Sequence, residues 1–139
     1  GQGIAAALSL GADGVQIGTL FASSKESSAH DLYKKTLVEA SDGGTELSLK
    51  NLVPVRIYKN AFYDKVKEAE ARCASREELA ELLGRGRAKK GIFLGDLDEG
   101  EIEFGQISSS IDEVKSVKEI MADLLRDYQS AVNKLPKSL

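Results

Sequence analysis

The chain has 139 residues, of which 42% are hydrophobic, 29% are charged and only two are proline. Such proportions are typical of one globular domain that builds a single core. The 19 basic and 22 acidic residues give a net charge of −3, and no basic run extends beyond residues 87–90. The charge balance therefore argues against a nucleic-acid or membrane-surface partner.

Cysteine usage and hydropathy bear on the compartment. The single cysteine, Cys73, cannot form an internal disulfide, which favours a reducing, cytoplasmic setting. We find no apolar run of membrane-spanning length and no basic segment followed by an apolar leader. The chain opens on Gly1-Gln2-Gly3 without a methionine, and we expect it to be part of a longer protein.

Helix and strand patterns alternate along the first half of the chain. Small and apolar residues predict a helix over 4–10, which Gly11 ends in the left-handed conformation. Residues 14–17 predict a short strand that is apolar enough to be buried on both faces. A helix over 28–40 and two short strands over 45–49 and 53–58 follow. This order is typical of an α/β protein.

The second half of the chain is mainly helical. A helix is predicted over 61–72, and a capping box of Ser75 and Glu78 predicts the start of the next one. After a turn-rich acidic loop over 95–100, Ser110 and Glu113 form a second capping box. Apolar residues then recur every three or four positions as far as Val132, which predicts a long amphipathic helix.

The predicted strand over 14–17 ends on Gly18 and Thr19. In parallel α/β folds, ligands lie at the carboxyl ends of strands, where free backbone amides point outward. A glycine there lets a phosphate approach the backbone, and a threonine hydroxyl adds a donor. A glycine needed only for a tight exit from the strand is the alternative interpretation.

Two stretches of the chain resemble a known enzyme family. The run from Gly1 to His30 resembles the late barrel segment of the flavin-dependent nitronate monooxygenases, also called 2-nitropropane dioxygenases, and of the related FMN-dependent enoyl-acyl-carrier-protein reductases. A later pair, Gly95-Asp96 and Gly105-Gln106-Ile107, is similar to the GD and GQ segments of that family. The matching residues of the first run are Gly3, Ala5–Ala7, Leu10–Ala12, Gly14–Gln16, Gly18–Thr19, Phe21 and Glu26–His30.

The resemblance implies a fold and a cofactor. The fold would be α/β, namely the C-terminal part of a TIM-type (β/α)8 barrel with a smaller, mostly helical covering domain. FMN would bind at the carboxyl ends of the barrel strands. By direct match, Gly18 and Thr19 would hold its phosphate, with Gln16 as a weaker candidate beside them. Gly105 and Gln106 match the segment that approaches the flavin ring.

The resemblance also divides the chain into three parts. Residues 1–41 would form the last strand and helices of the FMN-binding barrel, 42–104 the covering or substrate domain, and 105–139 a C-terminal helix that returns to the barrel. Leu20 stands where the family most often has an arginine. The histidine that the family uses as its base would precede Gly1, so no catalytic residue is assigned within this chain.

Other reactive side chains have a structural and a functional interpretation. His30 could act as a base near neutral pH, but the resemblance places it at a helix start, which favours a structural role. For Cys73, a plain, partly buried thiol is favoured over a nucleophile. The acidic residues within 96–101 lack calcium-loop spacing, so a solvated turn is favoured and no metal ligand is predicted.

Basic and aromatic residues of the second half are weighed in the same way. The basic residues within 85–90 could meet an anionic cofactor or carrier protein, but a solvated helix face is favoured. Tyr58, Phe62, Tyr63 and Phe93 are assigned to the core in preference to a stacking platform.

The expected function is oxidation of alkyl nitronates by molecular oxygen in an FMN-dependent enzyme. The first alternative is reduction of an enoyl thioester with NAD(P)H, and the second is an inert helical fragment without cofactor. The expected partners are a small-molecule substrate and, for the reductase, NAD(P)H. Unpaired strand edges and apolar helix faces further predict a homo-oligomer, and the 139-residue chain alone is expected to be inactive.

Overall fold

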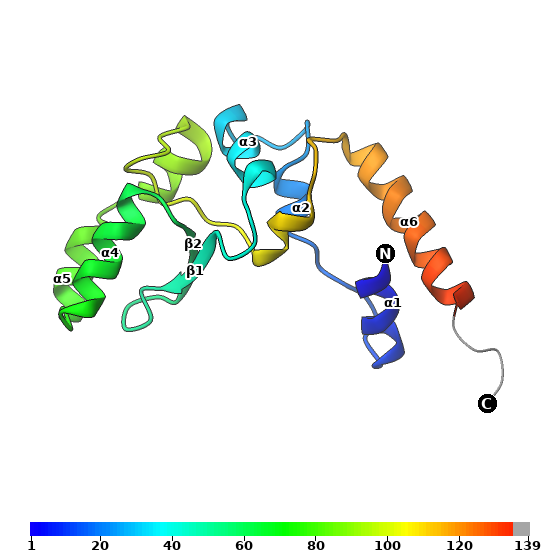
Figure 1. The fold of residues 1–139 in the computed structure, drawn as a ribbon, viewed down its shortest axis with the longest axis horizontal. Coiled ribbons are helices and arrows are strands. Elements are labelled where there is room, and N and C mark those ends of the chain that lie inside the picture. The colour runs from blue at the N-terminus through cyan, green and yellow to red at the C-terminus, as the bar shows by residue number, and fades with distance from the viewer. Residues whose placement is uncertain (135–139) are drawn as a thin grey trace.

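The computed structural model describes residues 1–134 (Figure 1). Two helices, α1 and α6, lie at one end of the molecule, and α4 and α5 lie at the other, with α2, α3 and a β-hairpin between them. In chain order the elements are α1 (Gln2–Ser9), α2 (Thr19–Ala22), α3 (Asp31–Glu39), β1 (Thr45–Ser48), β2 (Val55–Tyr58), α4 (Ala61–Ala71), α5 (Arg76–Leu83), the π-helical turn η1 (Lys89–Phe93), the 3-10 helix η2 (Gln106–Ser110) and α6 (Val117–Lys134).

A small antiparallel sheet separates two hydrophobic cores. β1 pairs with β2, and residues 101–104 extend the sheet through a bridge between Ile57 and Glu103. The backbone N–H of Tyr58 also donates to the carbonyl oxygen of Ile102 at 2.8 Å. Because successive side chains of a strand point to opposite faces, the sheet contributes to a core on each side.

The first core joins β2 to α4 and α5. It contains Leu49, Ile57, Phe62, Tyr63, Val66, Ala69, Ala74 and Leu79. Asn60 connects this core to the loop that follows η1: its side-chain oxygen caps α4 by accepting the N–H of Tyr63 at 3.0 Å, and its amide donates to the carbonyl oxygens of Leu97 and Gly100. The cap therefore fixes both the start of α4 and the acidic loop.

The second core lies on the opposite face of the sheet and joins it to α3. It contains Ala29, Tyr33, Leu37, Ala40, Ile102, Phe104 and Ile111. Phe104 is its aromatic centre, with its ring centroid 6.1 Å from that of Tyr33 and 5.5 Å from that of Tyr58. Residues 102–104 therefore anchor the segment that leads directly to Gly105.

Helix ends confirm one of the two predicted capping boxes. Ser75 and Glu78 cap α5 reciprocally, with distances of 3.2 and 2.7 Å. The second prediction is wrong, because η2 occupies residues 106–110 and α6 begins only at Val117. Its capping box is formed by Ser116 and Glu119, where the carboxylate accepts the N–H of Ser116 at 2.8 Å. Ile111 is buried in the second core instead of starting the helix.

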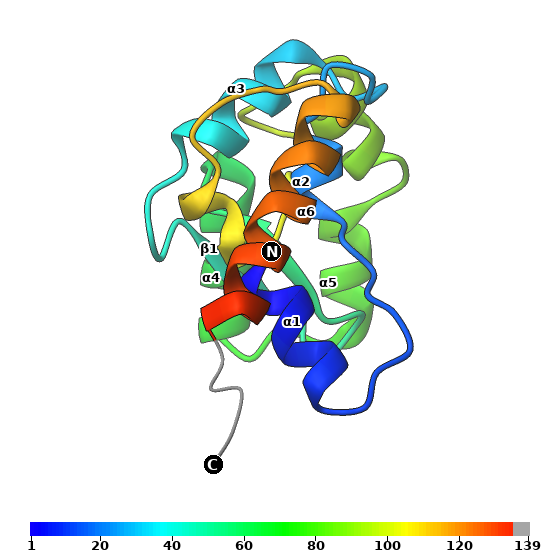
Figure 2. The ribbon, with the colours of Figure 1, turned by 90° about the vertical axis from the view of Figure 1, so that its right-hand side faces the viewer.

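Residues 14–17 differ most from the prediction. They have no regular secondary structure and are not a strand, because no segment within residues 1–134 pairs with them and a strand is defined by such a ladder. Val15 is 43% exposed, so the segment is not buried on both faces. Figure 2 shows it as part of the connection between α1 and α2. The described residues are thus mixed α/β and contain no closed barrel.

Two predicted burial states are also corrected. Phe93 is 49% exposed at the end of η1 and does not belong to either core, unlike Phe62 and Tyr63. Cys73 is exposed and follows α4 in the left-handed conformation, at φ 57°. Within residues 1–134, no helix combines the length and apolar composition that a membrane crossing requires.

Candidate functional site

The two sequence motifs meet at a hydrogen bond between Gly105 and Thr19. The backbone N–H of Gly105 donates to the hydroxyl oxygen of Thr19 at 3.0 Å, across 86 positions of sequence. A Cβ on residue 105 would lie 3.1 Å from that oxygen, so the absence of a side chain permits the close approach. The structure therefore brings together two residues that sequence analysis assigned to one site.

Thr19 is positioned by the helix that begins with it. It is the first residue of α2, and Gly18 is the N-cap whose carbonyl oxygen accepts the N–H of Ala22 at 2.9 Å. Because the Thr19 hydroxyl accepts from Gly105 through a lone pair, its own proton is left to donate to another group. The first-turn amides of a helix likewise have no acceptor within that helix.

Within residues 1–134, nothing requires Gly18 to lack a side chain. Its φ is −95°, which any residue adopts, and a Cβ there would have no atom within 4 Å among the described residues. Among the described residues, neither backbone strain nor crowding requires this glycine. A bound group that closely approaches the backbone would account for it.

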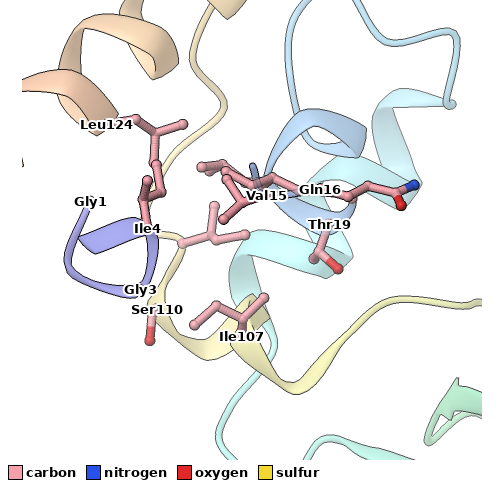
Figure 3. Close-up of a pocket in the computed structure, with 13 residues that line it drawn as sticks. Gly1, Gly3, Ile4, Val15, Gln16, Thr19, Ile107, Ser110 and Leu124 are labelled. Atoms are coloured by element: carbon pink, nitrogen blue, oxygen red, sulfur yellow. The ribbon is translucent and has the colours of Figure 1, made fainter. Parts of the chain in front are cut away.

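An open cavity of about 510 Å³ lies beside Gly18 and Thr19, in the size range of small-molecule sites. Figure 3 shows Ile4 and Leu124, from α1 and α6, on one side of it and Gln16 and Thr19 on the other. The side chains around it are mostly apolar. The lining residues are Gly1, Gly3, Ile4, Val15, Gln16, Ile17, Gly18, Thr19, Leu20, Ile107, Ser110, Ile111 and Leu124.

Three of the five predicted cofactor-binding residues line this cavity, namely Gln16, Gly18 and Thr19. Gly105 reaches them through its hydrogen bond to Thr19. Gln106 is exposed as the first residue of η2 and is not among the lining residues. Four of the five candidates are therefore gathered at one place, and Gln106 lies apart from the cavity.

Residues 101–104 position Gly105, and sequence reasoning missed the side chain that holds them. The Tyr33 hydroxyl, from α3, donates to the carbonyl oxygen of Glu103 at 2.8 Å. Burial, assisted by the charge of Glu103, raises the pKa of Tyr33 to about 12, so the phenol keeps its proton for this bond. An aromatic residue on the inner face of a predicted helix was the available sequence signal.

A buried lysine holds the loop between α2 and α3. Lys34 is 6% exposed, and its Nζ donates to the carbonyl oxygens of Ser27 at 2.9 Å and Lys25 at 3.4 Å. This loop carries the family-like segment from Glu26 to His30. Nothing in the local pattern distinguishes a lysine that binds buried carbonyls from a solvated one, so the sequence did not reveal it.

His30 has the structural role that was favoured. The Nδ1 atom of His30 accepts the N–H of Leu32 at 3.2 Å and caps α3, and the backbone N–H of His30 donates to the carbonyl oxygen of Ile92 at 2.8 Å. Since Nδ1 is the acceptor of this cap, the ring acts here as a helix cap.

Of the basic residues within 85–90, Arg85, Lys89 and Lys90 are exposed, as expected of a solvated cluster, whereas Arg87 packs on the first core. The Arg87 guanidinium lies 4.4 Å from the centre of the Phe62 ring and donates to the carbonyl oxygens of Leu83 and Glu99, each at 2.8 Å. It therefore stabilises the first core.

The acidic loop is organised by Asp96. Its carboxylate accepts the N–H groups of Asp98 and Glu99. These bonds, chiefly the one from Glu99, lower the pKa of Asp96. Within residues 1–134 no group of three or more His, Cys, Asp or Glu side chains is arranged to hold a metal ion.

The residues around Thr19 fit an anionic group at the polar end of the cavity. The fit rests on the uncrowded Gly18 and on the proton of the Thr19 hydroxyl, which is free to donate. The lining residues include neither lysine nor arginine, with Leu20 in the position where an arginine is common in the family. Neutral donors would therefore bind the anion, and the apolar walls would contact uncharged parts of the ligand.

These features define an α/β protein with a candidate binding site for a small molecule that carries an anionic group. A sequence model of the family described as nitronate monooxygenase matches residues 1–127. The chain therefore belongs to the nitronate monooxygenase family.

Individual relatives agree with this assignment. A probable nitronate monooxygenase from Bacillus subtilis is 29% identical over 127 residues, which are 91% of this chain and 36% of that protein. FabK from Thermotoga maritima is 37% identical with a TM-score of 0.87, over 96% of this chain and 42% of that one. A nitroalkane oxidase from Streptomyces ansochromogenes, 24% identical with a TM-score of 0.71 over 96% of this chain and 38% of that one, shares the fold. The chain thus spans less than half the length of these proteins.

Proposed function

We propose that the chain supplies the phosphate-binding side of an FMN-dependent oxidoreductase that oxidises alkyl nitronates with molecular oxygen. The hydrogen bond between Gly105 and Thr19 carries this proposal, because it joins both family-like motifs at the edge of one cavity. Membership of the nitronate monooxygenase family supports the reaction class.

Each residue of the site has a distinct task in this proposal. Gly18 lets the phosphate approach the backbone, and Thr19 donates its hydroxyl proton to a phosphate oxygen. Gly105 fixes the orientation of that hydroxyl. When bound, FMN supplies the redox chemistry, and the protein supplies binding and orientation.

The complete enzyme would need residues beyond those of this chain. The relatives are longer, and the resemblance places the catalytic base before Gly1. We propose that residues 1–41 belong to the barrel, 42–104 to a covering domain and 105–139 to the returning C-terminal segment, of which 135–139 lie outside the described residues. The 139-residue chain alone is expected to be inactive in turnover assays.

Reduction of an enoyl thioester with NAD(P)H is the second candidate function. The likeness to FabK favours it, since the TM-score of 0.87 and the identity of 37% exceed the values for the nitroalkane oxidase. Two assays on the complete protein separate the reactions. Oxygen consumption with propionate 3-nitronate supports the oxidase, and NAD(P)H oxidation with a crotonyl thioester supports the reductase.

Cofactor binding by the chain itself tests the proposed site. FMN is titrated against the chain, and flavin fluorescence is followed. Replacing Thr19 by valine removes the hydroxyl that would donate to the phosphate and that accepts the N–H of Gly105, so we expect the Kd to rise about tenfold or more. Thr19→Ser should stay close to the unmodified chain, and Thr36→Val on α3 serves as the control. A chain that remains colourless and does not alter FMN fluorescence would instead support the inert-fragment alternative.

A further inference from the structure

The segment that leads to Gly105 has acidic and apolar side chains in alternation. Ile102 and Phe104 are buried in the second core, so Glu101 and Glu103 point to the opposite face of the sheet. Glu101 is only 6% exposed. Two carboxylates two positions apart therefore share the face that packs on the first core.

The surroundings of Glu101 compensate little of its charge. Arg87 is the cation that acts on it, but its Nε and Nη1 donate to the carbonyl oxygens of Leu83 and Glu99. The ion pair of Arg87, at 3.5 Å, is also made with Glu99. On α4, the Tyr63 hydroxyl donates to the carboxylate of Glu46 at 2.6 Å, and on β2 the apolar Ile57 lies opposite Glu103.

Protonation of Glu101 and Glu103 would remove their poorly compensated negative charges. Burial, followed by the charge of Glu103, raises the pKa of Glu101 to about 7, and burial also raises the pKa of Glu103. A carboxyl group whose pKa is higher in the folded than in the unfolded state stabilises the fold less as pH rises. The loss begins above the ordinary pKa of about 4.3 and is complete above the folded value.

The position of residues 101–104 determines where Gly105 lies at the candidate site. On the edge of this segment that does not pair with β2, the Tyr33 hydroxyl donates to the carbonyl oxygen of Glu103. Two residues later, the N–H of Gly105 meets Thr19. Displacement of residues 101–104 would therefore move Gly105 away from Thr19, because Phe104 directly precedes Gly105 and is buried in the second core.

We propose that protonation of the Glu101 and Glu103 pair keeps residues 101–104 in the sheet and thereby holds Gly105 against Thr19, and that ionisation of the pair loosens this contact. The proposal rests on the proposed function only in treating the contact as part of a flavin site. The proton concentration would then regulate how firmly Gly105 is held against Thr19.

Amide hydrogen exchange on the chain without cofactor tests the coupling. Protection factors of the Gly105 amide are measured by NMR at pH 6 and pH 8 and compared with those of Leu79, whose N–H donates to Ser75 within α5. A folded pKa of about 7 against an unfolded value of about 4.3 predicts about a tenfold loss of Gly105 protection over this range. Leu79 should lose less, because its bond lies outside the segment.

Glu101→Gln keeps the shape of the protonated acid and removes its titration, so we expect its Gly105 protection to change less than twofold between pH 6 and pH 8. Glu103→Gln gives a second, smaller reduction of the pH effect. Glu81→Gln, at an exposed glutamate of α5, should behave like the unmodified chain.

Equal pH dependence in the unmodified chain and in Glu101→Gln would overturn the proposal, as would equal losses at Gly105 and Leu79. Because these readings need no FMN, a failure of flavin binding leaves this test intact. Conversely, a negative result here leaves the phosphate site at Gly18 and Thr19 unaffected.

Discussion

Gly95 lies directly against the imidazole of His30, so close that a Cβ on residue 95 would overlap the ring. Gly95 also has a φ of 73°, in the left-handed region. We expect Gly95→Ala to lower the free energy of unfolding by about 2 kcal/mol or more, because it adds a steric overlap to backbone strain.

Gly86 supplies the matched control for this prediction. Its φ of 74° is nearly the same, but a Cβ there would meet no atom within 4 Å. Gly86→Ala should therefore cost only about 1 kcal/mol in urea denaturation. Equal losses for both variants would show that crowding by His30 contributes nothing.

Cys73 is expected to destabilise the end of α4. It adopts φ 57°, while Ala74 and Cys73 donate to the carbonyl oxygens of Ala69 and Glu70 in the hydrogen-bond pattern that usually has glycine at this position. Cys73→Gly should raise the free energy of unfolding by about 0.5–1 kcal/mol. Cys73→Ala, which keeps a Cβ, should leave it nearly unchanged in the same denaturation series.

The capping box of α6 gives a third prediction. Ser116→Ala removes the cap and should cost about 1 kcal/mol, whereas Ser110→Ala should be nearly neutral. Thermal unfolding followed by circular dichroism measures both.

The hydrogen bonds from Ser116, with Lys25 nearby, lower the pKa of Glu119 to about 2. This contribution is present above the ordinary pKa of glutamate and is lost as pH falls towards 2, so Glu119→Gln should weaken the acid dependence of unfolding.

Self-association of the isolated chain remains a proposal that sedimentation can test. Leu125 on α6 is 61% exposed, and Val15 in the unpaired segment is 43% exposed. We expect a species heavier than the 14.9 kDa monomer. Leu125→Glu should shift the chain towards the monomer, and Leu94→Glu, at a leucine 62% exposed beyond η1, should not. A single monomeric species for the unmodified chain would contradict the prediction.

Local sequence signals predicted the structure correctly where residues close in the sequence make the backbone hydrogen bonds of an element. Ser75 and Glu78 cap α5 as predicted, and the strands at 45–49 and 53–58 form a hairpin within one residue or two of the expected limits. The same serine-to-glutamate spacing at Ser110 predicted the wrong start for α6. Tertiary burial of Ile111 decided between this serine and Ser116.

Features that depend on distant partners could not be predicted from local pattern. Residues 14–17 have strand-like composition, but a strand needs a neighbour, and none lies within residues 1–134. For the candidate site, the motif identified Gly18, Thr19 and Gly105, whereas Tyr33 and Lys34 act through bonds to backbone carbonyls. Such acceptors carry no side-chain signature, so the sequence could place Tyr33 on the inner face of a helix but could not show the bond that either residue makes.

The bond between Thr19 and Gly105 fastens the two ends of a long excursion of the chain. The hairpin, α4 and α5 all lie between those ends, which the Gly105 N–H and the Thr19 hydroxyl oxygen join at 3.0 Å. Under the proposed function, the residues that hold the nucleotide phosphate would stand at the two ends of this excursion, and the region that faces a substrate would lie inside it.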